Sequence, residues 1–459
     1  MKRIFLYTII FSTILLVGGC KKFVEVPPPQ NQLVSEVTFQ SESSANAAVA
    51  GLYSILNSYN YQFANFIGNG MPAFGADEFY YALSSSGFNE FRDNNLTPGN
   101  SYVRNLWSPL YNYIYQANAI VEGVNKSTTL KESAKKQFLG EAKFLRAFFY
   151  FYLVNYFGDV PLVLTTDYKA NSSMPRTKSA EVYASIISDL KEAQSNLNDD
   201  YISSERTRAN KAAATALLAR TFLYQEQWAQ AEAEASKLIS NNRYALVQDL
   251  NKVFLKNSSE AIWQIQTVNK STSGVNTWEG FNIVPASPTG RSYYQVYDAF
   301  FNAFEAGDKR KLSWINSYTN ASGTFFYPYK YKIRTATPVQ EYTMVLRFAE
   351  QYLIRAEARA QQNNLTGAKS DLDTIRQRSG LPPLPGNLSK AGMLLAVEQE
   401  RRIELFAEWG HRWFDLRRTG RALAVLSPLK PGLTATDLWY PIPLDAIKTN
   451  PALTQNNGY

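Results

Sequence analysis

The feature that most constrains the fold is a long apolar stretch, KESAKKQFLGEAKFLRAFFYFYLVNYFGDVPLV, at residues 131–163. Its first half is polar, whereas its second half is apolar on nearly all sides, which is typical of a helix surrounded by other elements. Gly158 and Pro161 follow in the order that ends a helix. We therefore expect a long helix whose second half lies in the centre of the protein. Glu141 and Arg146 within it are expected to form a structural charge pair.

Two later segments resemble each other and predict a pair of helical hairpins. Residues 210–240 and 349–376 each fit two short helices around a tight turn. Their alignment matches four pairs of positions: Ala219 with Ala356, Trp228 with Leu365, Ala231 with Ala368 and Leu238 with Ile375. Small residues where helices cross are typical of tetratricopeptide-like hairpins, which stack into scaffolds. Further helices are predicted at 45–56, 107–124, 179–197 and 391–409, so the fold is expected to be mostly α-helical.

The rarity of cysteine and histidine excludes several kinds of chemistry. Cys20 and His411 are the only residues of their types, so zinc sites built from several cysteines and histidines are excluded. A Ser-His-Asp triad would need His411, which lies in an aromatic, charge-rich segment and is expected to be a packed residue. No catalytic residue, metal site or cofactor is predicted, although calcium binding stays open because carboxylates alone do not define a site. The formal net charge is +8, but both signs are mixed along the chain, so no nucleic-acid partner is expected.

The N-terminus has the pattern of an exported protein. Lys2 and Arg3 precede an apolar run at residues 4–17, which is short for a membrane span and typical of a signal peptide. The run ends in VGGC at residues 17–20, which looks like a bacterial lipobox with Cys20 as the lipidated residue. We expect a lipoprotein signal peptide over 1–19, a Pro-rich tether over 20–34 and a single domain over 35–459.

Two segments between the helical blocks combine turn-forming residues with many aromatic rings. They span residues 69–102 and 268–300 and are expected to be long loops that converge on one binding site. Tyrosine and tryptophan rings have apolar faces and polar edges, which suit amphipathic ligands such as sugars. The candidate ligand-binding residues are Asp77, Tyr80, Tyr81, Phe88, Arg92, Trp278, Phe281, Tyr293 and Tyr294. In this hypothesis Trp278, Phe281, Tyr80 and Tyr81 stack on the ligand, while Asp77 and Arg92 hydrogen-bond it.

The C-terminal region contains two unusual strings. Residues 400–423, ERRIELFAEWGHRWFDLRRTGRAL, predict a helix on which Glu404, Glu408, Arg412 and Asp415 pair along one face. Residues 440–459 contain three prolines and predict an extended tail on the surface. Alternating residues between 318 and 342 predict a short hairpin or edge strand, to which we assign no function.

These C-terminal strings, together with EAKFLRAFFYFYLVNYFGDVPLV at 141–163, resemble signatures of the SusD/RagB family of outer-membrane nutrient-binding lipoproteins. The resemblance extends over nearly the whole chain. It implies a SusD-like, mostly α-helical fold with tetratricopeptide-like hairpins, and non-catalytic capture of a glycan. It also implies an outer-membrane lipoprotein that faces the cell exterior and docks on a TonB-dependent, SusC-like transporter.

Several alternatives remain open at this stage. Some members of the family are associated with peptides, and the same rings would serve a peptide ligand. A scaffold for outer-membrane assembly would use the helical hairpins alone, without the aromatic segments. A glycosidase needs two suitably spaced carboxyl groups, for which Asp77 and Glu78 are the candidates. Lys21 and Lys22 directly follow Cys20, which leaves the final membrane leaflet open.

Overall fold

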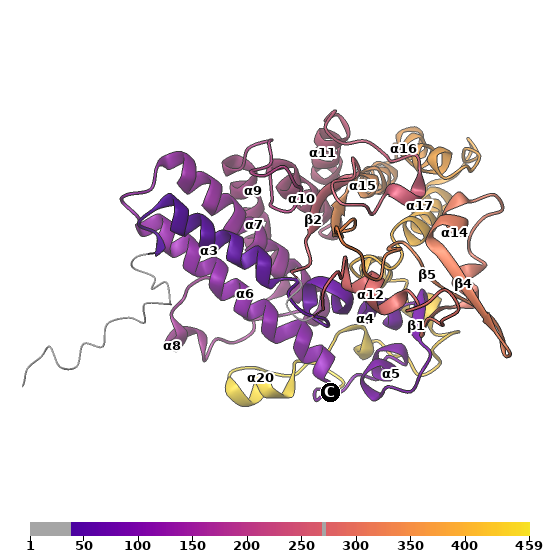
Figure 1. Ribbon diagram of the computed structural model, residues 1–459, viewed down its shortest axis with the longest axis horizontal. Helices are drawn as coiled ribbons and strands as arrows, with labels where there is room; N and C mark the ends of the chain where they lie inside the picture. Colours follow the sequence, from indigo (N-terminus) through magenta and orange to yellow (C-terminus); the bar gives the residue numbers. More distant parts are fainter. Residues whose placement is uncertain (1–37, 269–271) are drawn as a thin grey trace, which may run out of the picture.

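The computed structural model describes residues 38–268 and 272–459 (Figure 1). The predicted signal peptide, Cys20 and the tether lie outside the described residues, as do residues 269–271 of the second aromatic segment. The described chain is mostly α-helical, as predicted, with three two-stranded antiparallel sheets: β1 with β3, β2 with β6, and β4 with β5.

Long helices form the greater part of the molecule. They are α3 (Glu42–Ile55), α6 (Ser101–Lys126), α7 (Glu132–Phe157), α9 (Ser179–Asn196), α10 (Lys211–Tyr224), α11 (Trp228–Ile239), α15 (Phe348–Gln361), α16 (Leu365–Arg378) and α17 (Lys390–Glu404). The shorter helices are α4 (Gly68–Gly75), α5 (Ser86–Arg92), α8 (Tyr168–Asn171), α12 (Trp278–Ile283), α13 (Asp298–Phe301), α14 (Lys309–Trp314), α18 (His411–Arg418), α19 (Ala422–Leu426) and α20 (Leu444–Thr449). The strands are β1 (Phe79–Tyr81), β2 (Ala261–Ile265), β3 (Tyr294–Val296), β4 (Ile315–Asn320), β5 (Gly323–Pro328) and β6 (Thr343–Arg347). Figure 1 shows β1, β4, β5 and α5 at the end of the molecule opposite α3.

α7 is the central helix, as its apolar pattern predicted. All residues from Gly140 to Phe157 except Lys143 are buried, and α6 and α9 pack against the helix. It ends at Gly158, whose φ of 74° is accessible to glycine at little cost.

The expected charge pair within α7 is wrong, because its two members pair with other elements. Glu141 accepts a hydrogen bond from Arg208 at 2.6 Å, and Arg146 donates to Asp189 at 2.7 Å. Residues five positions apart lie on different faces of a helix, so Glu141 and Arg146 do not face each other. Both are nevertheless structural, since each ties α7 to a neighbouring segment.

The two predicted hairpins are present and pack beside each other. α10 and α11 form the first, α15 and α16 form the second, and α11 contacts α15. The turns repeat in detail: Glu226 (φ 55°) and Asn363 (φ 64°) occupy equivalent left-handed positions between the two helices of each hairpin. Ala231 and Ala368, which the alignment matched, are both fully buried. The small residues therefore lie where the helices approach most closely.

The continuous helix predicted over residues 400–423 is wrong. α17 ends at Glu404 and α18 begins at His411. In the intervening turn Ala407 (φ 55°), Trp409 (φ 47°) and Gly410 (φ 69°) have left-handed backbone, which a helix cannot contain. The turn places the Trp409 ring in the core, where it contacts Phe148 and Tyr152 of α7.

The charges of this segment enter a buried network instead of pairing along one helix face. Four basic side chains surround Glu404 and Glu408: Arg310, Lys330, Arg347 and Arg378. Burial opposes ionisation of Glu404, but the arginines lower its pKa well below the usual value. Arg347, at the end of β6, reaches both carboxylates, with distances of 2.6 Å to Glu404 Oε1 and 2.8 Å to Glu408 Oε2. The network therefore joins β6 to the turn after α17.

His411 is a packed residue, as expected. It opens α18, is buried, and has a pKa well below its usual value because of burial and the positive charges of Arg220 and Arg401. The prediction of an extended C-terminal tail on the surface is only partly correct, because the tail contains the short helix α20 and lies only partly on the surface. Tyr440 and Ile442 are buried, and Tyr440 N donates to Tyr156 O at 2.9 Å, whereas α20 has no buried residue.

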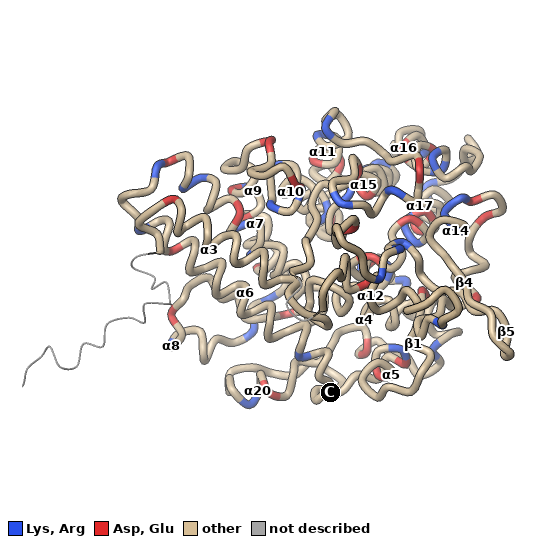
Figure 2. The backbone as a smooth tube through the Cα atoms, viewed as in Figure 1, with Lys and Arg blue, Asp and Glu red and all other residues tan. Residues whose placement is uncertain are grey.

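Charged residues of both signs are mixed along the described chain. Figure 2 shows Lys and Arg interspersed with Asp and Glu along its backbone. The hairpin predicted near residue 318 is present as β4 and β5, and it begins slightly earlier, at Ile315.

Candidate ligand-binding site

The two aromatic segments meet in the structure. β1 pairs with β3, which places Tyr80 opposite Gln295 and Tyr81 opposite Tyr294. The segments are more regular than expected, since residues 69–102 contain α4, β1 and α5, and residues 268–300 contain α12, β3 and α13. A local signal stabilises α12: the Thr277 hydroxyl accepts a hydrogen bond from Gly280 N at 3.0 Å, which caps the helix. The expectation of long irregular loops is therefore wrong, although the segments do converge.

Four of the nine candidate residues are buried: Asp77, Phe88, Trp278 and Tyr294. Trp278 is 2% exposed and packs edge-on against Phe281, with 5.4 Å between ring centroids. Tyr294 contacts Phe66 and Phe74 beneath the β1–β3 sheet. Neither ring has a free face, because both fill the core under the segments that carry them. The placement of Trp278 therefore does not favour the predicted stacking on a ligand.

Asp77 is engaged by the protein itself. Its carboxylate accepts hydrogen bonds from Arg412 Nε at 2.8 Å and Nη2 at 3.0 Å, and Arg402 lies 2.8 Å away. Burial would raise the pKa of Asp77, but Arg412 and Arg402 hold it below its usual value. The adjacent Glu78 is also buried, and burial together with the charge of Asp77 raises its pKa to about 8. These two carboxyl groups belong to the core and do not form an accessible acid pair.

The remaining five candidates reach the surface to different degrees. Tyr80, Tyr81, Arg92 and Phe281 are half-buried, and Tyr293 is exposed. The guanidinium of Arg334 lies 4.2 Å from the Phe281 ring, and Arg92 is bonded to Asp93.

Beside these residues lies a surface groove of about 590 Å³, which we call the tyrosine groove. One wall is the loop after α12, and the other is the β4–β5 hairpin with the residue that follows it. The lining residues are Val284, Pro285, Ala286, Ser287, Pro288, Thr289, Gly290, Asn316, Ser317, Tyr318, Thr319, Tyr327 and Tyr329. None of these lining residues is charged.

The hairpin wall was not predicted as part of a site. In its register Asn316 lies opposite Tyr327 and Tyr318 lies opposite Phe325, so these four side chains share one face. The rings of Tyr318 and Phe325 stack with 5.4 Å between centroids. Alternation along residues 318–342 was a sufficient signal for a hairpin. Its position beside the loop after α12 depends on tertiary packing, which no local pattern reports.

Gln295 connects the groove to the predicted residues. Its Nε2 donates to the Tyr318 hydroxyl at 2.9 Å, and its Oε1 accepts from the Tyr80 hydroxyl at 3.0 Å. Tyr80 of the first segment is thereby joined to the hairpin wall through β3. The structure thus groups Tyr80 with Tyr318 and Tyr329, and places Trp278 elsewhere.

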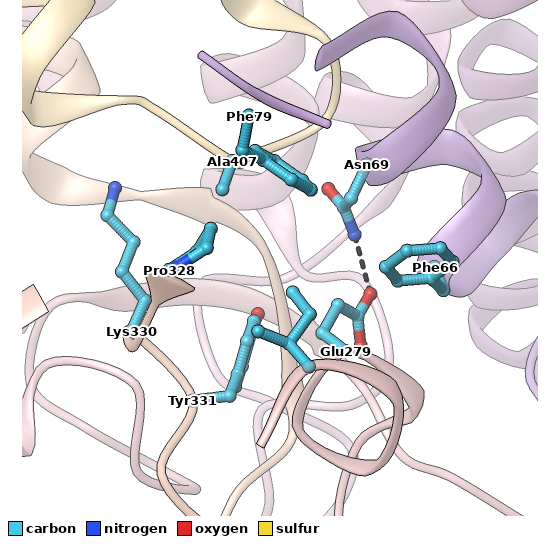
Figure 3. A pocket seen from close by; sticks show the side chains of 9 residues that line it. Phe66, Asn69, Phe79, Glu279, Pro328, Lys330, Tyr331 and Ala407 are labelled. Carbon is cyan, nitrogen blue, oxygen red and sulfur yellow. Dashed lines mark hydrogen bonds between the residues drawn. The ribbon is translucent and has the colours of Figure 1, made fainter. Parts of the chain in front are cut away.

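A small internal cavity lies beneath the groove (Figure 3). Tyr327 and Tyr329 line the groove, whereas the alternate residues Pro328 and Lys330 line the cavity. In Figure 3 Asn69 faces Glu279, and Asn69 Nδ2 donates to Glu279 Oε1 at 2.5 Å. Burial raises the pKa of Glu279 to about 7. Residues 327–330, at the end of β5 and just after it, therefore separate the groove from a buried polar layer.

The groove offers rings and neutral polar groups, and no acid or base. Tyr318 and Tyr329 are half-buried, and Asn316, Ser317 and Thr319 add an amide and hydroxyls. Hydrolysis of a glycosidic bond needs two carboxyl groups, which this lining does not contain. Among residues 38–268 and 272–459, no cluster of His, Cys, Asp and Glu has the arrangement of a metal site. None of the helices in the described chain is both long and apolar enough to cross a membrane.

The stacked helical hairpins and the uncharged, tyrosine-lined groove together are the features of a ligand-binding protein built on a helical scaffold. Residues 22–223 match a family model described as starch-binding and associating with the outer membrane, and residues 309–459 match the model of the SusD family. The chain belongs to the SusD/RagB family, and the glycan-binding proteins of this family are non-catalytic.

Individual relatives agree over nearly their full lengths. A SusD-like protein of Formosa agariphila is 26% identical over 517 aligned positions, which cover 96% of this chain and 97% of that protein. A solved structure described as a laminarin-binding SusD-like protein is 27% identical, with a TM-score of 0.78 over 92% of this chain and 100% of that one. A SusD superfamily protein from Bacteroides vulgatus shares the fold, with a TM-score of 0.80, 23% identity and coverage of 92% and 99%.

Proposed function

We propose that this protein captures a neutral oligosaccharide or polysaccharide in the tyrosine groove. The observation that carries the proposal is the lining itself: tyrosine rings, hydroxyls and an amide, without a charged side chain. Sugars have apolar C–H faces and hydroxylated edges, so rings and neutral hydrogen-bonding groups recognise them together. The starch-binding description of the family model and the laminarin-binding relative support the same ligand class.

In this proposal Tyr318 and Tyr329 stack on sugar faces, while Asn316, Ser317 and Thr319 hydrogen-bond hydroxyl groups. Tyr80 supports the site through Gln295, which holds the Tyr318 hydroxyl at 2.9 Å. A charged ligand would meet no opposite charge in this lining, so the groove favours neutral over acidic glycans.

The experiment is binding of the protein without residues 1–20 to arrays of glycans and peptides, followed by calorimetry. Tyr318→Ala should weaken glycan binding about tenfold, because a lost ring contact of ~1.4 kcal/mol corresponds to that factor. Tyr168→Ala is the matched control, since Tyr168 is 71% exposed and lies on α8, away from the groove. Equal glycan affinity of the two variants would place the site elsewhere. Binding of peptides alone would replace the glycan by a peptide ligand.

We further propose that the captured glycan passes to a TonB-dependent, SusC-like outer-membrane transporter on which this protein docks. The family model's association with the outer membrane supports this location, and the VGGC string supports anchoring through a lipid on Cys20. Capture of an external glycan requires that the protein face the cell exterior. Affinity purification of the full chain from its native membrane should recover a TonB-dependent transporter. Recovery of outer-membrane assembly components instead would favour the scaffold function.

A further inference from the structure

A second groove of about 780 Å³ lies next to the first. It is formed by the end of α5 and the residues after it, by Tyr297, and by the segment after α19. The lining residues are Arg92, Asp93, Asn94, Asn95, Tyr297, Leu429, Lys430, Pro431, Gly432, Thr434, Thr436, Asp437 and Gly458. We call it the distal groove.

A pair of tyrosine rings joins the two grooves. Tyr297, which lines the distal groove, packs against Tyr80 with 4.8 Å between ring centroids. The Tyr80 hydroxyl donates to Gln295, and Gln295 donates to Tyr318 in the tyrosine groove. Tyr80 and Tyr297 are both half-buried, so each ring retains accessible surface. The two grooves are therefore neighbours, and accessible aromatic surface lies between them.

The distal groove is lined by polar side chains and by charged side chains of both signs. Lys430 is 5% exposed, and its Nζ donates to Phe74 O at 2.5 Å and Gly75 O at 2.7 Å. These two hydrogen bonds hold the Lys430 amino group against the end of α4. Arg92 is neutralised by its two hydrogen bonds to Asp93. The lining pairs Arg92 with Asp93 and also contains Asp437 and Lys430, and burial lowers the pKa of Lys430 to about 7. The net charge of the groove is therefore small, which suits a neutral, hydroxylated ligand.

Asn95 provides an accessible hydrogen-bonding group at this groove. Its side chain is exposed, while its backbone N donates to Glu90 O at 2.9 Å and keeps the residue in place. An exposed amide on a fixed backbone can donate to one sugar hydroxyl and accept from another.

We infer that one glycan chain occupies both grooves, crossing the Tyr80–Tyr297 pair, so that this protein selects oligosaccharides long enough to span them. This inference rests on the proposed glycan binding in the tyrosine groove. Sites for one small ligand have volumes of roughly 300–1,000 Å³, and each groove alone is already of that size. A disaccharide would fill only one of the two grooves, whereas a longer chain gains contacts in both.

The test uses calorimetry with α-1,4-linked and β-1,3-linked gluco-oligosaccharides of increasing length, from disaccharides to octasaccharides, on the protein without residues 1–20. Affinity should continue to rise with oligosaccharide length beyond the length that fills the tyrosine groove. Asn95→Ala and Tyr297→Ala should each lower the affinity for the long chains by about tenfold and leave the affinity for short chains unchanged. Tyr318→Ala should lower both affinities.

Asn387→Ala is the matched control for Asn95→Ala, because Asn387 is also an exposed asparagine but lies between α16 and α17. The inference is overturned if the affinity stops rising at short lengths, or if Asn95→Ala and Tyr297→Ala bind long chains like the control. If the proposed glycan binding is itself wrong, the result is different, because the wild-type protein then binds none of these chains. That result also overturns the inference.

Discussion

Burial separates the aromatic side chains of the two converging segments into two groups. Trp278 and Tyr294 fill the core, whereas Tyr80 and Tyr293 reach the surface. Residue type does not distinguish the groups, because tyrosines occur in both. The sequence therefore identified segments that lie beside the groove, but not which of their rings face solvent. That distinction depends on Phe66 and other partners far away along the chain.

Trp278→Ala should destabilise the fold instead of acting through lost ligand contacts. Removing a large buried ring costs about 3–5 kcal/mol in the free energy of unfolding. Urea unfolding of the ligand-free protein measures this cost, and Tyr293→Ala, which truncates an exposed ring, should cost much less. Trp278→Ala with unchanged stability and lost glycan binding would restore the original stacking hypothesis.

Glu279 should make stability depend on pH. Burial raises its folded-state pKa to about 7, whereas the ordinary value is 4.5. Between these values the folded state retains a proton that the unfolded state has released, so this contribution to stability falls as pH rises from 4.5 to about 7. Glu279→Gln lacks this titration. The stability of the variant relative to wild type should therefore increase over that window, by about 1.4 kcal/mol per unit of pKa difference.

Urea unfolding of both proteins at several pH values across the window measures this effect. Glu78 also has a raised pKa, but it titrates in both proteins and cancels from the comparison. The charge of Glu279 contributes to the raised pKa of Glu341, so both proteins are compared in a Glu341→Gln background. A difference in stability that stays constant with pH would show that Glu279 titrates normally in the folded state.

Among the elements, the helical hairpins were the most predictable. Their periodicity and small residues are local properties, and the turn positions Glu226 and Asn363 repeat in both copies. The break between α17 and α18 was not predictable from residues 400–423 alone. Its left-handed turn is formed where Trp409 enters the core against α7, and where Glu404 and Glu408 reach Arg347. The spacing of the charged residues fits a continuous helix, but Glu404 and Glu408 instead form ion pairs with Arg347 of β6.

Arg347→Met should destabilise the protein strongly. Arg347 pairs with Glu260, Glu404 and Glu408, and its loss leaves these buried carboxylates with fewer partners. Removing one member of a buried ion pair costs about 3–5 kcal/mol. Arg243→Met is the matched control, because Arg243 pairs with the exposed Asp200 and should contribute less than about 1 kcal/mol. Chemical unfolding that shows equal losses for the two variants would contradict the structural role of the network.

At the scale of the whole molecule, anchoring should depend on one residue beyond the described chain. Cys20→Ser should move the protein from the membrane fraction to the soluble fraction, because the proposed attachment depends on acyl chains carried by Cys20. Fractionation and metabolic labelling with a fatty acid measure the change, with Lys21→Ser as the control. A Cys20→Ser protein that stays in the membrane fraction and is still labelled would exclude Cys20 as the lipidated residue.

The residues matched by the family models do not include all of the tyrosine groove. The models match residues 22–223 and 309–459, so the loop at 284–290 that forms one wall of the tyrosine groove lies between them. The strings that made the family recognisable, around α7 and α17, are instead buried in the core and in the ion network. Recognition of the family therefore came from the scaffold, whereas one wall of the tyrosine groove lies outside the matched residues and was identified from the structure.

The loop at 284–290 offers a position at which the proposed ligand specificity can be changed. The loop at 284–290 is largely exposed, and the network around Arg347 that joins the distant elements does not include it. If the tyrosine groove binds the glycan as proposed, replacing this loop with the corresponding segment of a relative should change the sugar preference and leave the free energy of unfolding nearly unchanged. A set of chimeras made at this position would share one scaffold and differ in the ligand that each of them binds.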